Sequence, residues 1–327
     1  MKFHTLFVLL LLLTACDPLA FQAPTAQVVI ITAVPSATPP PTATPVASRT
    51  PIPTPTIAIT PSATPFPCDE ERGQVFKFDT FRSEIAVETL RYRVYIPPCY
   101  QQTLKRYPYA VLLHGAGQNE SEWELIGVIQ ALDQGFRLGV LPPMIVVLPY
   151  TGSIGNDNTF PPDPSYETVV LEELLPAVER DFCTWNTREH RAIGGISRGG
   201  FWAYSIALRH PDVFGIIGGH SAFFPDDLNE VPAAFNPLEL ARNSSFLPEA
   251  RLRMYLDNGA NDFAGISQEE FSSRLSARGI AHTYVINPVG DHNEEYWSAH
   301  VSEYLAFYGR DWPKDVAQLP SCLDPSP

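Results

Sequence analysis

Short apolar runs recur along the chain from residue 90 onward, and amphipathic stretches separate most of them. The segment 90–96 alternates apolar and polar residues, which predicts a strand with one face in solvent. Six further runs are continuous and too short for helices, a pattern typical of parallel strands buried on both faces. These runs cover 109–113, 144–148, 191–196, 213–218, 253–256 and 283–286.

Helical periodicity occupies much of the sequence between these runs. The predicted helices cover 123–136, 166–182, 200–209, 268–278 and 294–307, and we expect Pro176 to kink the second of them. Alternating strands and helices predict an α/β fold with a mostly parallel, doubly wound sheet and helices on both faces. Ligands bind such sheets at the carboxyl ends of the strands, so the following loops are the place to look for chemistry.

The N-terminus has a different pattern, which begins with the uninterrupted apolar run Leu6–Leu13. A membrane-spanning helix needs about 20 apolar residues, so this run is too short to span and fits the core of a secretory signal peptide. The residues Leu13-Thr14-Ala15-Cys16 resemble a bacterial lipoprotein box, in which the cysteine receives the lipid. We therefore expect residues 1–16 to be a lipoprotein signal peptide with Cys16 as the lipidation site.

Residues 17–67 contain 13 prolines interleaved with Thr, Ala and Ser, a composition that cannot build a core. We expect a disordered linker of extended, polyproline-like chain with a full reach of about 150 Å. We expect residues 68–327 to form one folded domain with a single sizeable core. The predicted location is extracytoplasmic, with the domain lipid-anchored to the bacterial cell membrane.

The charge balance narrows the possible partners. The chain has 22 Lys and Arg against 36 Asp and Glu, a formal net charge of −14. This excess of acid argues against nucleic acid as a partner and against attachment to anionic lipid through basic residues. Any membrane attachment must therefore come from acyl chains.

The cysteines suggest disulfides. Five are present, and if Cys16 is lipidated an even number remains, which in an exported domain suggests two disulfides with three possible pairings. We favour Cys68–Cys99 and Cys183–Cys322. A zinc site is not expected, because no pair has CxxC spacing.

The segment Gly195-Ile196-Ser197-Arg198-Gly199 has the G-x-S-x-G pattern between a predicted strand and a predicted helix. This is the context of a nucleophile elbow, a turn so sharp that side chains beside the serine would clash. Ser197 is therefore the candidate nucleophile.

A serine nucleophile needs a base and a carboxylate that orients the base, and in this fold they follow in the order Ser, acid, His. His292 lies in a loop between the last strand and the last helix, where the base is needed, whereas His220 at a strand end is its rival. For the acid we prefer Asp262, beyond a flexible glycine, over Asp257 at the strand end.

The oxyanion hole should combine two backbone amides. One belongs to Arg198, the residue after the nucleophile, and the other to the loop after residue 113. Ala116 is the preferred donor in this loop and Gly117 the alternative, while His114 is expected to shape the loop. We also expect the loop 152–165 to line the acyl or alcohol pocket. No metal and no cofactor is required.

Four segments resemble the esterase D, feruloyl esterase and mycolyltransferase branch of the α/β-hydrolases. They are LLHGAGQNESEW, GGISRGGFWA, LDNGANDF and GDHNEEYW, and the likeness covers about residues 88–310. The resemblance implies Ser197 as nucleophile, Asp262 as acid and His292 as base. Trp123 and Trp297 match aromatic positions of the pattern, and as helix residues we expect them to pack in the core.

The expected function is that of a serine carboxylic-ester hydrolase that works through an acyl-enzyme. The resemblance implies a small-molecule or polysaccharide ester outside the cytoplasm, such as a feruloyl or acetyl ester of a carbohydrate. Two alternatives are an acyltransferase that excludes water from the acyl-enzyme and a non-catalytic surface-binding module on a hydrolase scaffold. An intact candidate triad argues against the second.

Overall fold

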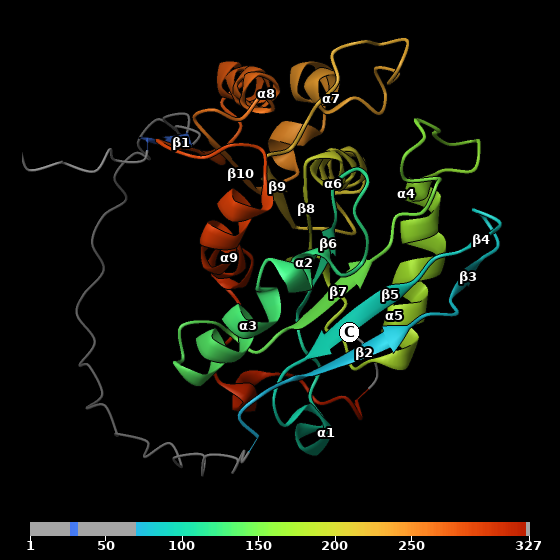
Figure 1. Ribbon diagram of the computed structural model, residues 1–327, viewed down its shortest axis with the longest axis vertical. Helices are drawn as coiled ribbons and strands as arrows, with labels where there is room; N and C mark the ends of the chain where they lie inside the picture. Colours follow the sequence, from blue (N-terminus) through green and yellow to red (C-terminus); the bar gives the residue numbers. More distant parts are fainter. Residues whose placement is uncertain (1–26, 32–69, 325–327) are drawn as a thin grey trace, which may run out of the picture.

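A nine-stranded sheet forms the centre of the computed structural model, which describes residues 27–31 and 70–324 (Figure 1). The strand order is β1-β11-β10-β9-β8-β6-β7-β5-β2. The strands are β1 Gln27–Ile31, β2 Gln74–Phe78, β5 Tyr92–Ile96, β6 Tyr109–Leu113, β7 Ile145–Pro149, β8 Arg191–Ile196, β9 Ile216–His220, β10 Arg253–Gly259 and β11 His282–Asn287. A separate small hairpin pairs β3 Arg82–Ser83 with β4 Glu88–Thr89.

The middle of the sheet is parallel. Strands β7, β6, β8, β9, β10 and β11 run in one direction, while β5 and β2 at one edge and β1 at the other are antiparallel to their neighbours. The predicted mostly parallel sheet is confirmed. The carboxyl ends of the parallel strands meet at one edge, where the candidate site residues follow β6, β8, β10 and β11.

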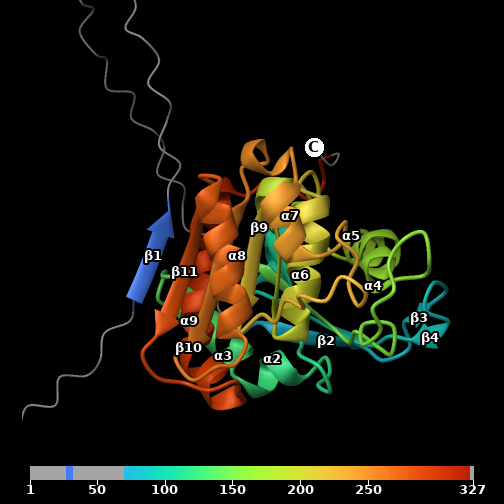
Figure 2. The same cartoon turned by 90° about the horizontal axis from the view of Figure 1, so that it is seen from above.

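Helices cover both faces of the sheet, as predicted (Figure 2). Successive residues of the central strand β6 alternate between two apolar cores: Val111 packs with the helices on one face, and Leu112 with those on the other. The first face carries α4 Tyr166–Thr168, α5 Leu175–Asp181, α6 Arg198–Arg209, α7 Pro237–Asn243 and α8 Gly265–Ala277, and the second carries α2 Glu122–Leu125, α3 Val128–Arg137 and α9 Glu294–Gly309.

Two predicted helices differ from the structure. The helix expected over 123–136 is divided into α2 and α3, because Gly127 between them has a φ of 97°. The helix expected over 166–182 contains a π-helical stretch, Val169–Leu174, in which the amide of Leu175 donates to the carbonyl of Val170. Pro176 follows this wider turn, so the chain accommodates the proline by a change of helical pitch.

Two strands are also shifted from their predicted positions. Strand β9 begins at Ile216, because Val213 and Phe214 belong to the turn after α6 and donate their amides to the carbonyl of His210. Strand β10 continues through polar residues to Gly259, since its ladder with β11 extends that far.

Strand β1 falls within the stretch 17–67, for which we expected no regular structure. It pairs antiparallel with β11, from Gln27 opposite Ile286 to Ile31 opposite His282. A free sheet edge is a template for added strands, and Val-Val-Ile-Ile is a sequence with high β propensity. The expectation of irregular chain is therefore wrong for these five residues.

Several predictions fall outside the described residues. These are the signal peptide, the lipidation of Cys16, the rest of the linker and the bond from Cys68 to Cys99. The predicted disulfide Cys183–Cys322 is present, with its Cα atoms 5.7 Å apart. Within residues 27–31 and 70–324, no helix is long and apolar enough to cross a membrane.

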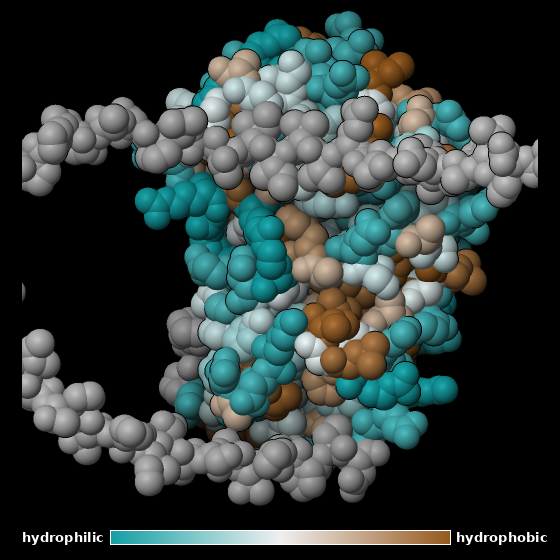
Figure 3. Space-filling view, turned by 90° about the vertical axis from the view of Figure 1, so that its left-hand side faces the viewer, coloured by the Kyte–Doolittle hydropathy of each residue, from teal (hydrophilic) through white to brown (hydrophobic). Residues whose placement is uncertain are grey.

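The face shown in Figure 3 is mainly hydrophilic. Figure 3 shows hydrophobic residues confined to small patches on the face that it presents.

Candidate active site

Ser197 lies at the turn between β8 and α6, with a φ of 52° and a ψ of −115°. A φ in this range is strained for any residue other than glycine, and such strain clusters at functional sites. A Cβ atom added to Gly195 would lie 2.3 Å from the backbone of Gly199, and one added to Gly199 would lie 2.4 Å from the carbonyl oxygen of Leu113. The predicted need for small residues beside the serine is confirmed.

The loop after β9 holds this turn in place. The amide of Ser197 donates to the carbonyl of His220 over 3.0 Å, and the amide of Phe223 donates to the carbonyl of Ser197 over 3.2 Å. The segment 220–223 therefore packs directly against the candidate nucleophile.

Asp262 and His292 form a hydrogen-bonded pair. His292 Nδ1 lies 2.8 Å from Asp262 Oδ1, which also accepts the amide of Ala264 over 2.8 Å. The side chain of Asp262 is fully buried, whereas that of His292 is 15% exposed. Burial raises the pKa of Asp262. Three neighbours, His292, the Ser221 hydroxyl and the Ala264 amide, lower this pKa by more, so it lies below its ordinary value. The acid is therefore ionised near neutral pH.

Among the described residues no hydrogen bond joins the side chains of Ser197 and His292, but two aromatic rings connect the segments that carry them. The phenyl ring of Phe263 lies 4.3 Å from the His292 ring and 6.1 Å from that of Phe223, whose amide binds Ser197. In unliganded enzymes catalytic hydrogen bonds are often long and tighten only when substrate binds. His292 Nε2 has no partner within residues 70–324, so it remains available to take a proton.

The loop after β6 lies beside the candidate nucleophile Ser197, where an oxyanion hole would need it. A Cβ atom on Gly115 would lie 3.4 Å from Ser197 Cβ. Within the described part of the chain, the amides of Ala116 and Arg198 donate to no protein acceptor, and neither does that of Gly117. Free amides in these two segments are the donors that an oxyanion hole needs.

His114 shapes this loop, as predicted. Its Nδ1 lies 2.7 Å from the carbonyl of Gly115, and its Nε2 accepts the amide of Thr151 over 3.0 Å. Burial lowers the pKa of His114, which keeps the ring neutral.

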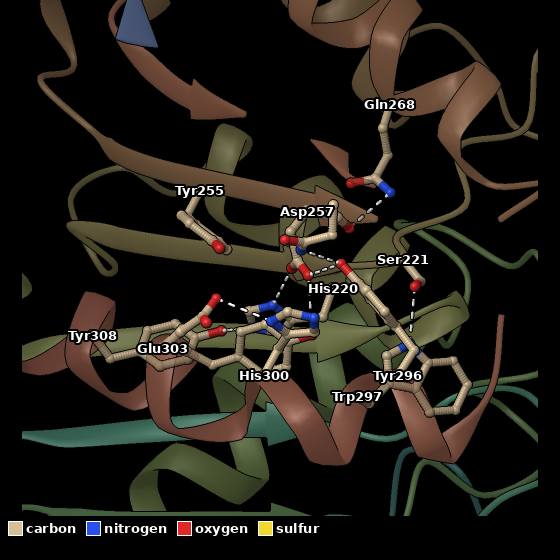
Figure 4. A network of polar contacts seen from close by, with 12 residues as sticks. His220, Ser221, Tyr255, Asp257, Gln268, Tyr296, Trp297, His300, Glu303 and Tyr308 are labelled. Carbon is tan, nitrogen blue, oxygen red and sulfur yellow. Dashed lines mark hydrogen bonds and ion pairs between the residues drawn. The ribbon is translucent and has the colours of Figure 1, made fainter. Parts of the chain in front are cut away.

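The rival pair His220 and Asp257 lies deeper in the core (Figure 4). Both side chains are fully buried, and His220 Nδ1 lies 2.8 Å from Asp257 Oδ1. His220 Nε2 lies 2.8 Å from the Tyr308 hydroxyl, and Asp257 Oδ2 accepts the hydroxyls of Tyr296 and Tyr304 over 2.6 and 3.0 Å. With every ring nitrogen and carboxylate oxygen engaged, this pair has no group left for catalysis.

Two hollows lie near His292. The ring of Phe263, which lines one of them, lies 4.3 Å from the His292 ring, and His292 itself lines the other. One has a volume of about 690 Å³, and its lining includes Phe223, Phe263 and Ile266, whose side chains are 42, 60 and 80% exposed. The other has a volume of about 480 Å³ and a more polar lining, formed by Gln118, His292, Asn293, Glu294, Glu295 and Trp297.

The loop 152–165 contributes no residue to the lining of these two hollows, so its predicted place at an acyl or alcohol pocket stays a prediction. It is held against α6, because the Arg198 guanidinium donates to the carbonyls of Gly155 and Asp157 and to Asn158 Oδ1, and Trp202 donates to Gly155 as well. The Arg198 side chain thus fixes this loop against α6.

Sequence reasoning missed four residues of the site. Phe223 follows strand β9 and lies in no motif, and Phe263 ends the segment LDNGANDF after β10 but was given no role, although exposed aromatic residues after parallel strands are a usable signal. Ser221 directly follows His220 and has a φ of 51°. Trp297 packs in the core as expected, but its indole also donates to Ser221.

Comparisons with known proteins agree with this geometry. The family model described as "Putative esterase" matches residues 83–310. An endo-1,4-beta-xylanase/feruloyl esterase of Xylanibacter ruminicola is 32% identical over 168 residues, 47% of this chain and 23% of that protein. An esterase of Mycobacterium tuberculosis is 30% identical over 134 residues, 39% of this chain and 28% of that protein. The chain thus spans about a quarter of the length of these relatives.

Solved structures show the same fold. A ferulic acid esterase superposes with a TM-score of 0.66 at 26% identity, over 73% of this chain and 98% of that one. An S-formylglutathione hydrolase from Agrobacterium tumefaciens superposes with a TM-score of 0.62 at 18% identity, over 75% of this chain and 97% of that one, which shows the fold alone. Because the family model covers more than half of the chain, with every candidate site residue of the folded domain inside it, the chain belongs to this esterase family and has the α/β-hydrolase fold.

Proposed function

We propose that the protein hydrolyses carboxylic esters through Ser197, His292 and Asp262. The observation that carries this proposal is the pairing of His292 Nδ1 with a buried, ionised Asp262 at 2.8 Å, together with a serine held at a strained φ of 52° in a strand–turn–helix. An imidazole bound at Nδ1 presents its other nitrogen as a base.

In the proposed mechanism, Ser197 Oγ attacks the acyl carbonyl and His292 Nε2 takes its proton. Asp262 holds the imidazole in the required tautomer and stabilises its positive charge. The amides of Ala116 and Arg198 bind the oxyanion, and His292 returns the proton to the departing alcohol. Water then attacks the acyl-enzyme with His292 again as the base.

We propose an aromatic acyl ester of a carbohydrate, such as a feruloyl ester, as the substrate class. The hollow of about 690 Å³ supports this choice, because Phe223, Phe263 and Ile266 offer apolar surface to an acyl group and the Phe263 ring packs on His292. The more polar hollow, which His292 itself lines, suits a sugar alcohol and incoming water, which favours hydrolysis over transfer. The relatives with feruloyl esterase in their names support the same choice.

The test of this substrate class is Phe263→Ala with two esters that share one alcohol, one feruloyl and one acetyl. We expect kcat/KM for the feruloyl ester to fall about tenfold, since loss of aromatic contact costs on the order of 1–2 kcal/mol, and kcat/KM for the acetyl ester to change little. Leu138→Ala, which removes a 62% exposed side chain at the end of α3, is the control. If Phe263→Ala lowered kcat/KM equally for both esters, the result would contradict the proposal that this hollow binds the acyl group.

We also propose that the protein is lipid-anchored at Cys16 and extracytoplasmic. The sequence Leu13-Thr14-Ala15-Cys16 supports the anchor, and the disulfide Cys183–Cys322 supports an oxidising compartment. Cys16→Ser should move the protein from the membrane fraction to the soluble fraction on cell fractionation. Persistence of the variant in the membrane fraction would contradict the anchor.

A further inference from the structure

Ser221 has an unusual backbone for its residue type. It follows β9 with a φ of 51° and is fully buried. Glycine adopts this conformation without strain, whereas serine does not. A strained, non-glycine residue beside an active site points to a use for its side chain.

The Ser221 hydroxyl already accepts one hydrogen bond. Trp297 Nε1–H donates to Ser221 Oγ over 2.9 Å (Figure 4). A buried hydroxyl also has a proton to donate, and buried polar groups are almost always satisfied. The proton therefore needs an acceptor close to Ser221.

Asp262 offers that acceptor. Its Oδ1 receives both His292 and the amide of Ala264. Its Oδ2 is buried and, among residues 70–324, has no partner that meets hydrogen-bond geometry. The Ser221 hydroxyl is one of the neighbours that lower the pKa of Asp262, so the two groups lie close together. Trp297, the donor to Ser221, also packs edge-on against His292, with ring centroids 5.3 Å apart.

We propose that Ser221 is a positioning residue for catalysis, whose hydroxyl donates to Asp262 Oδ2 and fixes the carboxylate that orients His292. The inference rests on the proposed function and deepens it. Trp297 orients Ser221, Ser221 holds the second oxygen of Asp262, and the first oxygen holds His292. A carboxylate held at both oxygens cannot rotate away from the imidazole.

Ser221→Gly separates this role from a purely structural one. Glycine removes the hydroxyl and suits a φ of 51°, so the melting temperature should stay the same or rise. We expect kcat to fall on the order of tenfold with KM unchanged, because a loosened base misplaces proton transfer. If Ser221 served only the turn, glycine would keep kcat, and that result would overturn the proposal.

The pH profile provides a second measurement. The Ser221 dipole points its proton at the Asp262–His292 pair, so its removal favours the protonated pair. The acid limb of the kcat/KM profile should therefore move to higher pH. The other titratable groups near the pair are Asp257 and Tyr284 from the sheet and Glu294 and Glu295 from α9, and Ser221→Gly alters none of them. An unmoved acid limb would count against the proposal.

Ser205→Ala is the matched control. Its hydroxyl is also fully buried, but it donates to the carbonyl of Phe235 over 2.7 Å and takes no part in the site. This variant should lose stability while its kcat and acid limb stay as in the wild type.

Trp297→Phe tests whether Trp297 acts on the Asp262–His292 pair through Ser221. It removes the donor to Ser221 and keeps an aromatic ring beside His292, so we expect a smaller shift of the acid limb in the same direction. In the Ser221→Gly background it should add no further shift. A full additional shift would show that Trp297 acts without Ser221, against the proposal.

Covalent labelling with a fluorophosphonate distinguishes a failure of the proposed esterase function from a failure of the proposed role of Ser221. If the wild type is not labelled, the proposed function itself fails. If it is labelled and Ser221→Gly matches the wild type in kcat and pH profile, only the role of Ser221 fails.

Discussion

Ser197→Ala should lower kcat for ester hydrolysis roughly 10⁶-fold, the scale seen when the nucleophile of a serine-hydrolase triad is removed. Without Oγ no acyl-enzyme can form, and only the oxyanion hole and substrate binding still act on the ester. KM should change little, because the apolar hollow lined by Phe223 and Phe263 and the free amides of Ala116 and Arg198 remain. Steady-state kinetics with a feruloyl ester measures the effect.

The variant should keep its fold, because alanine has the same backbone restrictions as serine at this turn. Its thermal unfolding is expected to match the wild type closely. Ser205→Ala, with a hydroxyl lost from the same helix α6, should retain its kcat. A folded Ser197→Ala enzyme with more than about 1% of wild-type kcat would be incompatible with serine as the nucleophile.

Asp262→Asn should lower kcat about 10⁴-fold with little loss of stability. The asparagine amide can donate to His292 Nδ1 and so stabilise the tautomer whose proton lies on Nε2, which cannot act as the base. The charge that supports the imidazolium is also lost. Kinetics at several pH values together with thermal unfolding measure both effects.

Asp257→Asn is the matched control, since this carboxylate is also buried and paired with a histidine. It accepts His220, Tyr296 and Tyr304, so the substitution should destabilise the fold by about 3 kcal/mol, as expected for a broken buried network. The kcat of the folded fraction should stay within about tenfold of the wild type. A larger catalytic loss in Asp257→Asn than in Asp262→Asn would reverse the assignment of the two acids.

The alternation of short apolar runs with helical periodicity was enough to predict the fold. Strands such as β6 and β8 are continuous apolar segments because both of their faces pack against helices, and their bounds match the prediction. Strand β10 extended beyond its apolar run, because Asp257 is buried through its hydrogen bonds rather than through hydrophobicity. Periodicity has no means of detecting a polar side chain that is satisfied inside a core.

Residue order also identified the pairing of Asp262 with His292, since a glycine-rich loop after β10 brings the acid back toward the base. Ser221 could not be predicted in this way. Its place depends on a positive φ and on contact with Trp297, which lies 76 residues further along the chain. Strand β1 was missed for a similar reason: only the free edge of β11 makes Gln27–Ile31 a strand.

Peptide mapping after reaction with a fluorophosphonate tests the central claim most directly. A serine activated by His292 and Asp262 should form one covalent adduct, located by mass spectrometry on Ser197, and the adduct should be absent from Ser197→Ala. An adduct on another residue, or none in the folded wild-type protein, would contradict the proposed nucleophile.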